Sequence, residues 1–93
     1  MKMKDFPKEL VIGGRTWVVK FRRVIEGNPI YLGMCYFEEA EIHIRLGQSP
    51  RERLATLWHE IFHAYEWEYG VKLGHKIIRK LEYAQSDFVL ENF

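Results

Sequence analysis

Hydrophobic and polar residues alternate in the first half of the chain, whereas hydrophobic residues recur every three or four positions in the second half. Within residues 15–24, Trp17, Val19 and Phe21 alternate with more polar neighbours, a pattern typical of a half-buried β-strand. Residues 9–12 form a second apolar run, and Gly13-Gly14 between the two runs is a typical hairpin turn. The pattern therefore predicts a first β-hairpin.

A second hairpin is predicted from residues 30–37 ("IYLGMCYF") and 40–46 ("AEIHIRL"), which flank Glu38-Glu39. In the latter run Ile42, Ile44 and Leu46 face one side of the strand and the polar residues face the other. Gly33 in the former run indicates a bulge or a close approach of another part of the chain.

The period then changes to that of a helix. Ser49 is a good N-cap, Pro50 suits the first helical position and Glu52 lies three residues after the cap, so a helix is expected from Pro50 to about Tyr69, before Gly70. Its core-facing stripe comprises Leu54, Leu57, Trp58, Ile61, Phe62 and Tyr65. A second helix is expected from about His75 to Glu91, with the apolar face Ile77, Ile78, Leu81, Ala84 and Phe88. The prediction is one α+β domain spanning residues 1–93, in which a small antiparallel, possibly mixed, sheet packs on two C-terminal helices.

Composition narrows the possible partners and the compartment. The net charge of +1 comes with no broad basic field, so no nucleic-acid partner is expected. No apolar segment approaches the ~18 residues of a membrane span, so no membrane association is expected either. The single cysteine, Cys35, cannot form an internal disulfide and fits a reducing compartment. The chain is therefore expected to be cytoplasmic.

The predicted first helix carries the sequence "LWHEIFHAYE". His59 and His63 are four residues apart and share one helix face, away from the hydrophobic stripe, so both imidazoles can reach one ion. Zinc accepts neutral imidazole nitrogens, and Glu60 could hold a metal-bound water. This H-E-x-x-H pattern is typical of zinc peptidases, in which the glutamate is the general base.

A catalytic zinc needs a third protein ligand. Glu66 and Glu68 follow on the same helix and are poor candidates, because they turn away from the histidine pair or lie too far along the helix. Glu66 and Tyr69 also occupy the positions of the glycine and third histidine of the longer metzincin pattern, which excludes that class.

The second helix offers two candidates for the third ligand, Glu82 and His75. Glu82 lies beside Ile78 and Leu81. A carboxylate at the edge of a core-facing stripe needs a partner, and a metal would be one. A surface position, or an ion pair with Arg79 or Lys76, is the structural alternative. His75 lies two turns before Glu82, about 10 Å along a helix, so the two cannot bind one ion without distortion. Glu82 is the preferred ligand and His75 the rival, which could instead line the cleft.

The segments "ERLATLWHEIFHAYE" and "KLEYAQSDFVLENF" resemble small gluzincin-type metallopeptidases, which include the minigluzincins and the ImmA/IrrE-like proteins of phages and mobile elements. The resemblance covers about residues 30–93. It implies a minimal zincin fold in which His59, His63 and Glu82 bind one Zn²⁺ and Glu60 is the general base. In larger gluzincins an acidic residue often lies four positions after the ligand glutamate and orients a histidine; here that position is Ser86, with Asp87 next to it.

The predicted function is hydrolysis of a peptide or protein substrate, which would add as an extended strand alongside residues 40–46. Four side chains are unranked candidates for stabilising the oxyanion: Tyr83, His75, Tyr36 and His43. Residues that orient the zinc ligands through hydrogen bonds, without touching the ion themselves, are expected among His75, Tyr83 and Asp87. The alternative is a zincin-fold regulatory module without turnover, with residues 88–93 either lying in the cleft or packing as a helix end. The sequence leaves the oligomeric state open.

Overall fold

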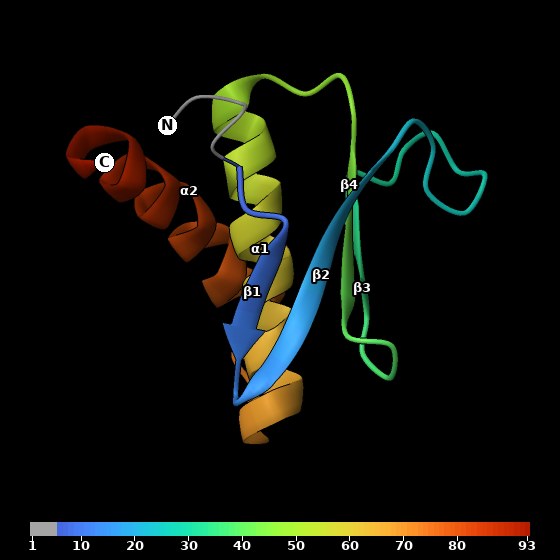
Figure 1. The fold of residues 1–93 in the computed structure, drawn as a ribbon. Helices are drawn as coiled ribbons and strands as arrows, with labels where there is room; N and C mark the ends of the chain where they lie inside the picture. The colour runs from blue at the N-terminus through green and yellow to red at the C-terminus, as the bar shows by residue number, and fades with distance from the viewer. Residues whose placement is uncertain (1–5) are drawn as a thin grey trace.

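The computed structural model describes residues 6–93. They form four strands and two helices: β1 (Glu9–Ile12), β2 (Arg15–Arg22), β3 (Gly33–Tyr36), β4 (Glu41–Arg45), α1 (Pro50–Tyr69) and α2 (His75–Asn92). Figure 1 shows the strands in one sheet, with α1 lying along one face and α2 beyond it. The predicted α+β fold is confirmed, and both helices begin at the predicted residues.

The sheet is mixed, with strand order β1-β2-β4-β3. Both predicted hairpins are antiparallel, whereas β2 and β4 pair in parallel, with Val19 opposite Ile42. As a result β4 lies inside the sheet and β3 forms its edge. The expectation that a peptide could add alongside residues 40–46 is therefore wrong, because β2 and β3 already occupy both sides of β4.

Helix α1 is fixed at both ends and along one side. The Ser49 hydroxyl accepts a hydrogen bond from the Glu52 N–H at 3.3 Å, and Gly70 ends the helix in the left-handed conformation. Leu54, Leu57 and Ile61 are buried against the sheet, as predicted. The sheet supplies the other side of this core through Trp17, Val19, Ile42 and Ile44.

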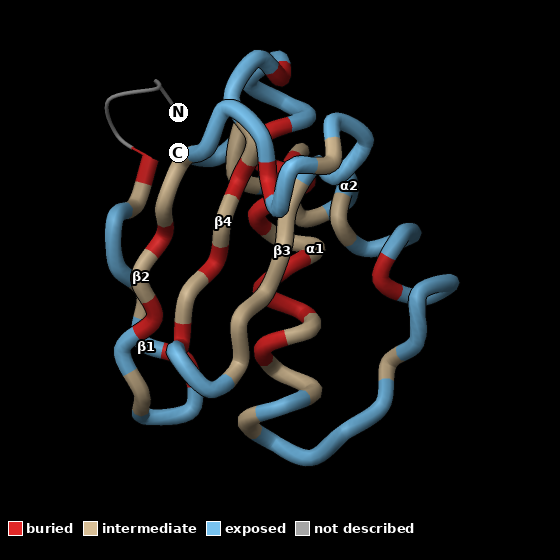
Figure 2. The backbone as a smooth tube through the Cα atoms, turned by 90° about the vertical axis from the view of Figure 1, so that its right-hand side faces the viewer, coloured by how far each residue is buried: buried red, intermediate tan, exposed pale blue. Residues whose placement is uncertain are grey.

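Helix α2 packs on α1. It lies outside the layers formed by α1 and the sheet, as the ribbon in Figure 1 and the tube in Figure 2 show. Its predicted apolar face is wrong: of those residues only Ile78 is buried, and Ile77, Leu81 and Phe88 are exposed. The buried residues are Ile78 and Ser86, eight positions apart with Glu82 midway between them. Residues at this spacing share one helix face, so α2 turns Glu82 toward α1.

The end of α2 packs on the core rather than in the cleft described below. Val89 and Leu90 contact the hydrophobic core cluster, whereas Phe93 is exposed. This agrees with the expectation of a helix end that packs on the core. No helix within residues 6–93 is both long and apolar enough to cross a membrane.

Candidate metal centre

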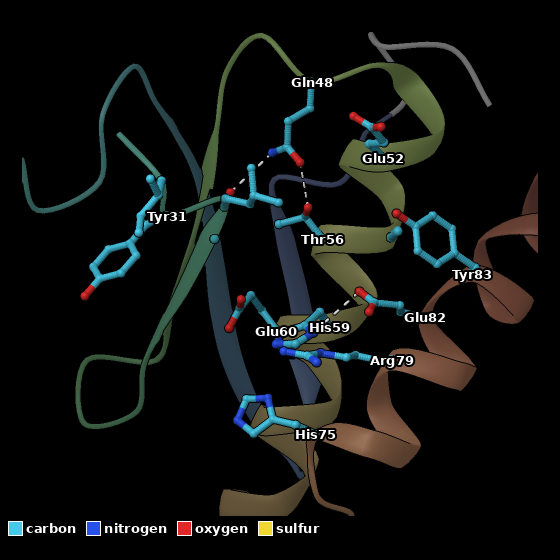
Figure 3. A pocket seen from close by; sticks show the side chains of 14 residues that line it. Tyr31, Gln48, Glu52, Thr56, His59, Glu60, His75, Arg79, Glu82 and Tyr83 are labelled. Atoms are coloured by element: carbon cyan, nitrogen blue, oxygen red, sulfur yellow. Dashed lines mark hydrogen bonds and ion pairs between the residues drawn. The ribbon is translucent and has the colours of Figure 1, made fainter. Parts of the chain in front are cut away.

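A cleft with a volume of about 660 Å³ separates α2 from the start of β3, with α1 between them (Figure 3). Residues 30–33 line one side, and Arg79, Glu82 and Tyr83 of α2 line the other. His59 and Glu60 enter the cleft from α1, and His75 enters it from the first turn of α2. The cleft therefore gathers side chains from segments far apart in the sequence, including most of the predicted site.

His59 and His63 direct their Nε2 atoms at each other, 3.2 Å apart. Two nitrogens bound to one tetrahedral zinc at about 2.0–2.1 Å are themselves about 3.3 Å apart. The helix thus holds these nitrogens at a spacing that fits a shared zinc ion. In the absence of an ion, the same spacing allows one imidazole to donate a hydrogen bond to the other.

The other ring nitrogen of each histidine faces a carboxylate. Nδ1 of His63 lies 2.8 Å from Oε1 of Glu66, and Nδ1 of His59 lies 3.4 Å from Oε2 of Glu82. Metal-binding histidines commonly donate their second N–H to such a carboxylate, which fixes the ring and its tautomer. Glu66, expected to turn away from the pair, instead contacts it. Its position three residues after His63 was the available signal.

The structure brings His75, rather than Glu82, into the group of mutually close ligand atoms. One nitrogen each from His59, His63 and His75 lies within 4.8 Å of the others. The Glu82 carboxylate instead approaches the Nδ1 side of His59 (Figure 3). Within residues 6–93 no such group contains both His75 and Glu82, in keeping with the expectation that one ion cannot take both.

Burial controls the charge of His59. Its pKa is lowered to about 4, first by desolvation and then by the neighbouring His63, His75 and Arg79. The imidazole is therefore neutral at neutral pH, which is the form that binds metal. The contact with Glu82 is consequently not a pair of opposite charges. Burial also raises the pKa of Glu82, whose side chain is only 14% exposed, so this carboxylate would gain from a nearby cation.

Glu60 is buried on the β3 side of the cleft and is 6% exposed. A Cβ atom on Gly33 would lie 2.9 Å from its Oε2 and 2.6 Å from Cγ2 of Thr56, so only glycine leaves room for this carboxylate. The predicted close approach at Gly33 is confirmed. Burial first, and then the Glu82 charge, raise the pKa of Glu60 to about 8. An acid with such a pKa in a cleft is typical of a functional site.

The remaining candidates on α2, Tyr83 and Asp87, differ in whether they reach the cleft. Tyr83 lines the cleft, with the Arg51 guanidinium 4.6 Å from its ring centre. Asp87 forms a bidentate pair with Arg51, at 2.9 and 3.1 Å, and is not brought to the histidines. The Ser86 hydroxyl donates a hydrogen bond to the Glu82 backbone carbonyl at 2.6 Å. It therefore does not take the place of the acidic residue that orients a histidine in larger gluzincins.

Tyr36 and His43 lie on the wrong face of the sheet for the oxyanion role. Their rings contact each other at 4.5 Å, whereas the neighbouring Ile42 and Ile44 are buried toward α1. Successive strand residues point to opposite faces, so both rings face away from α1 and the cleft. Arg79, which the sequence suggests only as an ion-pair partner of Glu82, also lines the cleft, three residues before Glu82 on the same side of α2.

Comparison with known proteins identifies no relative: no family model, no curated protein and no solved structure matches the chain. The site is therefore defined by its own residues. It combines two histidines at zinc-ligand spacing, a buried glutamate beside them and further donors on a second helix.

Proposed function

We propose that the protein is a zinc-dependent metallopeptidase-like enzyme, in which His59 and His63 bind the ion and Glu60 is the general base. The observation that carries the proposal is the 3.2 Å separation of the two Nε2 atoms beside a buried glutamate. The neutral state of His59 supports it, because a protonated imidazole could not bind zinc.

Glu82 is the proposed third ligand, and to reach an ion at Nε2 of His59 its carboxylate has to turn away from Nδ1, which it contacts at 3.4 Å. Its carboxylate is largely buried, and Lys and Arg side chains form no ion pair with it among the described residues. His75 is exposed at the start of α2, where an unliganded imidazole remains solvated without cost. The resemblance to gluzincins supports the same choice. His75 is the competing ligand, because its nitrogen already lies within 4.8 Å of both other histidines.

The chemistry divides between the ion and the chain. Bound zinc would polarise the scissile carbonyl and make a water molecule more acidic. Glu60 would accept a proton from that water and pass it to the leaving amine. Its pKa of about 8 refers to the metal-free protein, and a nearby dication would favour the ionised form that acts as a base. His75, Arg79 and Tyr83 line the cleft as possible donors to the oxyanion.

An extended peptide substrate is proposed to add to the outer edge of β3. The Leu32 carbonyl accepts a hydrogen bond from the Arg45 N–H at 2.9 Å, so Leu32 and Arg45 form a hydrogen-bonded pair. Hydrogen-bonded and non-hydrogen-bonded residue pairs alternate along an antiparallel ladder. The backbone N–H and C=O groups of Gly33 and Cys35 therefore point away from β4, toward the outer edge. Among the described strands none pairs with that edge, and Gly33 itself lines the cleft. Backbone bonds there would align a peptide beside Glu60.

The competing function is a zinc-binding regulatory module of the same fold without turnover. The weak attachment of α2 favours it, because only two of its residues are buried, Ile78 and Ser86. A cleft wall that is held so loosely would position a substrate poorly, and poor positioning reduces catalysis.

The proposal extends to a cytoplasmic location. Cys35 is the only cysteine of the chain and its thiol is free. A protein with no disulfide to lose is suited to a reducing compartment.

The first test is the zinc content of protein purified without chelator, for wild type, His59→Ala, Glu82→Ala and His75→Ala. One zinc per chain that is lost in His59→Ala and Glu82→Ala but kept in His75→Ala supports the proposed ligands. Loss in His75→Ala with retention in Glu82→Ala would assign the third position to His75. No zinc in wild type, even after zinc is added, would overturn the proposal. Incubation of the zinc-loaded protein with a peptide library then distinguishes the two functions, because an enzyme cleaves some of the peptides and a regulatory module cleaves none.

A further inference from the structure

The Glu66 carboxylate joins the two helices at the end of the candidate metal centre. Its Oε1 lies 2.8 Å from Nδ1 of His63, one turn earlier on α1. Its Oε2 accepts hydrogen bonds from the backbone N–H groups of Leu73, at 2.8 Å, and Gly74, at 3.1 Å. One side chain thus contacts both a proposed ligand and the loop that leads into α2.

The contact with His63 has a definite consequence for the imidazole. An ionised carboxylate can only accept hydrogen bonds, so the Nδ1 atom facing it must carry the proton. A neutral imidazole with its proton on Nδ1 has a bare lone pair on Nε2. That Nε2 atom is the one that faces His59 at 3.2 Å. Glu66 therefore selects the tautomer of His63 that can bind a metal.

The contacts with the loop act on α2. Helix α1 ends at Gly70, and α2 begins at His75 after Gly74, which has a positive φ of 83° and gives α2 no side-chain cap. The two N–H groups bonded to Glu66 immediately precede α2. Ile78 is the only buried residue in the first two turns of α2, so these bonds help to set the start of α2 against α1.

We propose that Glu66 is a positioning residue for the metal centre: one carboxylate oxygen sets the metal-binding tautomer of His63, and the other holds the 70–74 loop that places α2. The inference rests on the proposed function in that His63 is taken as a zinc ligand. A plain structural role, in which Glu66 only ties the loop to the end of α1, is the competing explanation.

Glu66→Gln separates these explanations. The glutamine oxygen can still accept from Leu73 and Gly74, but its NH₂ group then faces Nδ1 of His63 as a donor. The imidazole must then carry its proton on Nε2, the nitrogen needed for the metal. Glu68→Gln is the matched control, because Glu68 lies two residues further on and pairs with Arg15, at 2.8 Å, instead of a histidine.

Two measurements test the inference. Ring ¹⁵N NMR of the metal-free protein, at a pH where imidazole is neutral, should find the His63 proton on Nδ1 in wild type and Glu68→Gln. It should find the proton on Nε2 in Glu66→Gln. Competition with a chromogenic chelator should give about 10–100-fold weaker zinc binding for Glu66→Gln, the usual effect of losing such a partner, and unchanged binding for Glu68→Gln.

Each contrary result has one meaning. A wild-type His63 with its proton on Nε2 would overturn the inference, and this measurement requires no variant to fold. Equal zinc affinity of Glu66→Gln and wild type, or equal weakening in Glu68→Gln, would also overturn it. If wild type binds no zinc, the proposed function fails, while the NMR result still decides whether Glu66 sets the tautomer.

Discussion

The two helices contribute to the same cleft but are held very differently. Helix α1 has nine buried residues out of 20, whereas α2 has two out of 18. The firmly held helix carries His59, Glu60 and His63, and the loosely held helix carries both candidates for the third ligand. The difference indicates a division of labour, in which α1 supplies the precise geometry and α2 closes onto it. A bound ion would be the strongest link between them.

The largest expected effect lies on α1. Glu60→Gln should lower peptide hydrolysis by about 10²–10⁴-fold, the usual contribution of a general base, because the amide cannot accept the proton. Zinc content should remain that of wild type. Turnover measured on a cleaved library peptide, beside zinc analysis, checks both points. Glu52→Gln, an exposed cleft glutamate on the same helix, is the control and should keep its activity.

The second prediction concerns the link between the helices. Zinc at about 100 times its dissociation constant should slow amide exchange in α2 by about 100-fold, because opening of α2 must release its ligand. The measurement is hydrogen–deuterium exchange with and without zinc, read separately for α1 and α2. In wild type the gain should be larger in α2 than in the core of α1, and Glu82→Ala should abolish the difference. Equal protection of both helices would contradict the division of labour.

Gly33→Ala tests how tightly α1 is fitted to the sheet. The new Cβ would meet Thr56 at 2.6 Å and Glu60 at 2.9 Å, so the protein should lose about 1–3 kcal/mol of stability, as expected for an overpacked core. Urea denaturation measures this. Gly47→Ala is an informative comparison because its Cβ would meet nothing, which leaves only the strain of its positive φ of 92°. A Gly33→Ala protein as stable as wild type would show that β3 yields readily.

Two titrating groups of α1 predict how the metal-free protein responds to pH. Glu60 has a folded pKa of about 8, above its unfolded value, so its contribution to stability is lost as pH rises toward 8. His59 has a folded pKa of about 4, below its unfolded value of ~6.5, so its contribution is lost as pH falls below that value. At acidic pH the changes in stability from the two groups have opposite signs and nearly cancel. Between pH ~6.5 and ~8 only the Glu60 shift contributes of the two, and the free energy of unfolding should fall by about 2 kcal/mol over this range.

Urea denaturation of chelator-treated protein across that pH range checks this expectation. Glu60→Gln should remove the decline, because its amide does not titrate. A wild-type stability that stays flat or rises between these pH values would show that Glu60 is ionised without difficulty in the folded state.

The smallest effect is expected from the exposed pair that joins the helices. Asp87→Asn removes the charge that Arg51 contacts at 2.9 Å, but both side chains are well solvated. Exposed ion pairs contribute little to stability, so the melting temperature should stay close to that of wild type. A large drop would mean that α2 depends on this pair, and the proposed role of the metal as the main link would weaken.

The same contrast explains what could be predicted from the sequence. The limits of α1 follow from Ser49, Pro50 and Gly70, whose effects are local. The hydrophobic stripe of α1 was also predicted correctly, because a helix packed on a sheet must bury its apolar residues. Strand order was not predictable from alternation, which gives the period of a strand but not its neighbour. For this reason the sequence predicts an edge position for β4, whereas the structure places it inside the sheet.

The errors on α2 have a related cause. Hydrophobicity predicts one face for α2, but a helix that buries so little is oriented by a few contacts, here at Ile78, Ser86, Val89 and Leu90. The sequence analysis considers Glu66 only as a direct metal ligand and rejects it, whereas the structure places its carboxylate on His63. Its partner is the far nitrogen of His63, and this choice between ring nitrogens becomes visible only with side-chain geometry.

The edge position of β3 also bears on how such a protein could diversify. In the connection between β2 and β3, Ile30, Tyr31 and Leu32 line the cleft without belonging to a strand. Substitutions there change the wall that a substrate meets and leave the ligand-bearing helix untouched. We expect a library randomised at these three positions to yield variants with altered peptide preference and unaltered zinc affinity. In evolutionary terms, the peptide selectivity of this small fold could then change by substitution without any change in the residues that carry the chemistry.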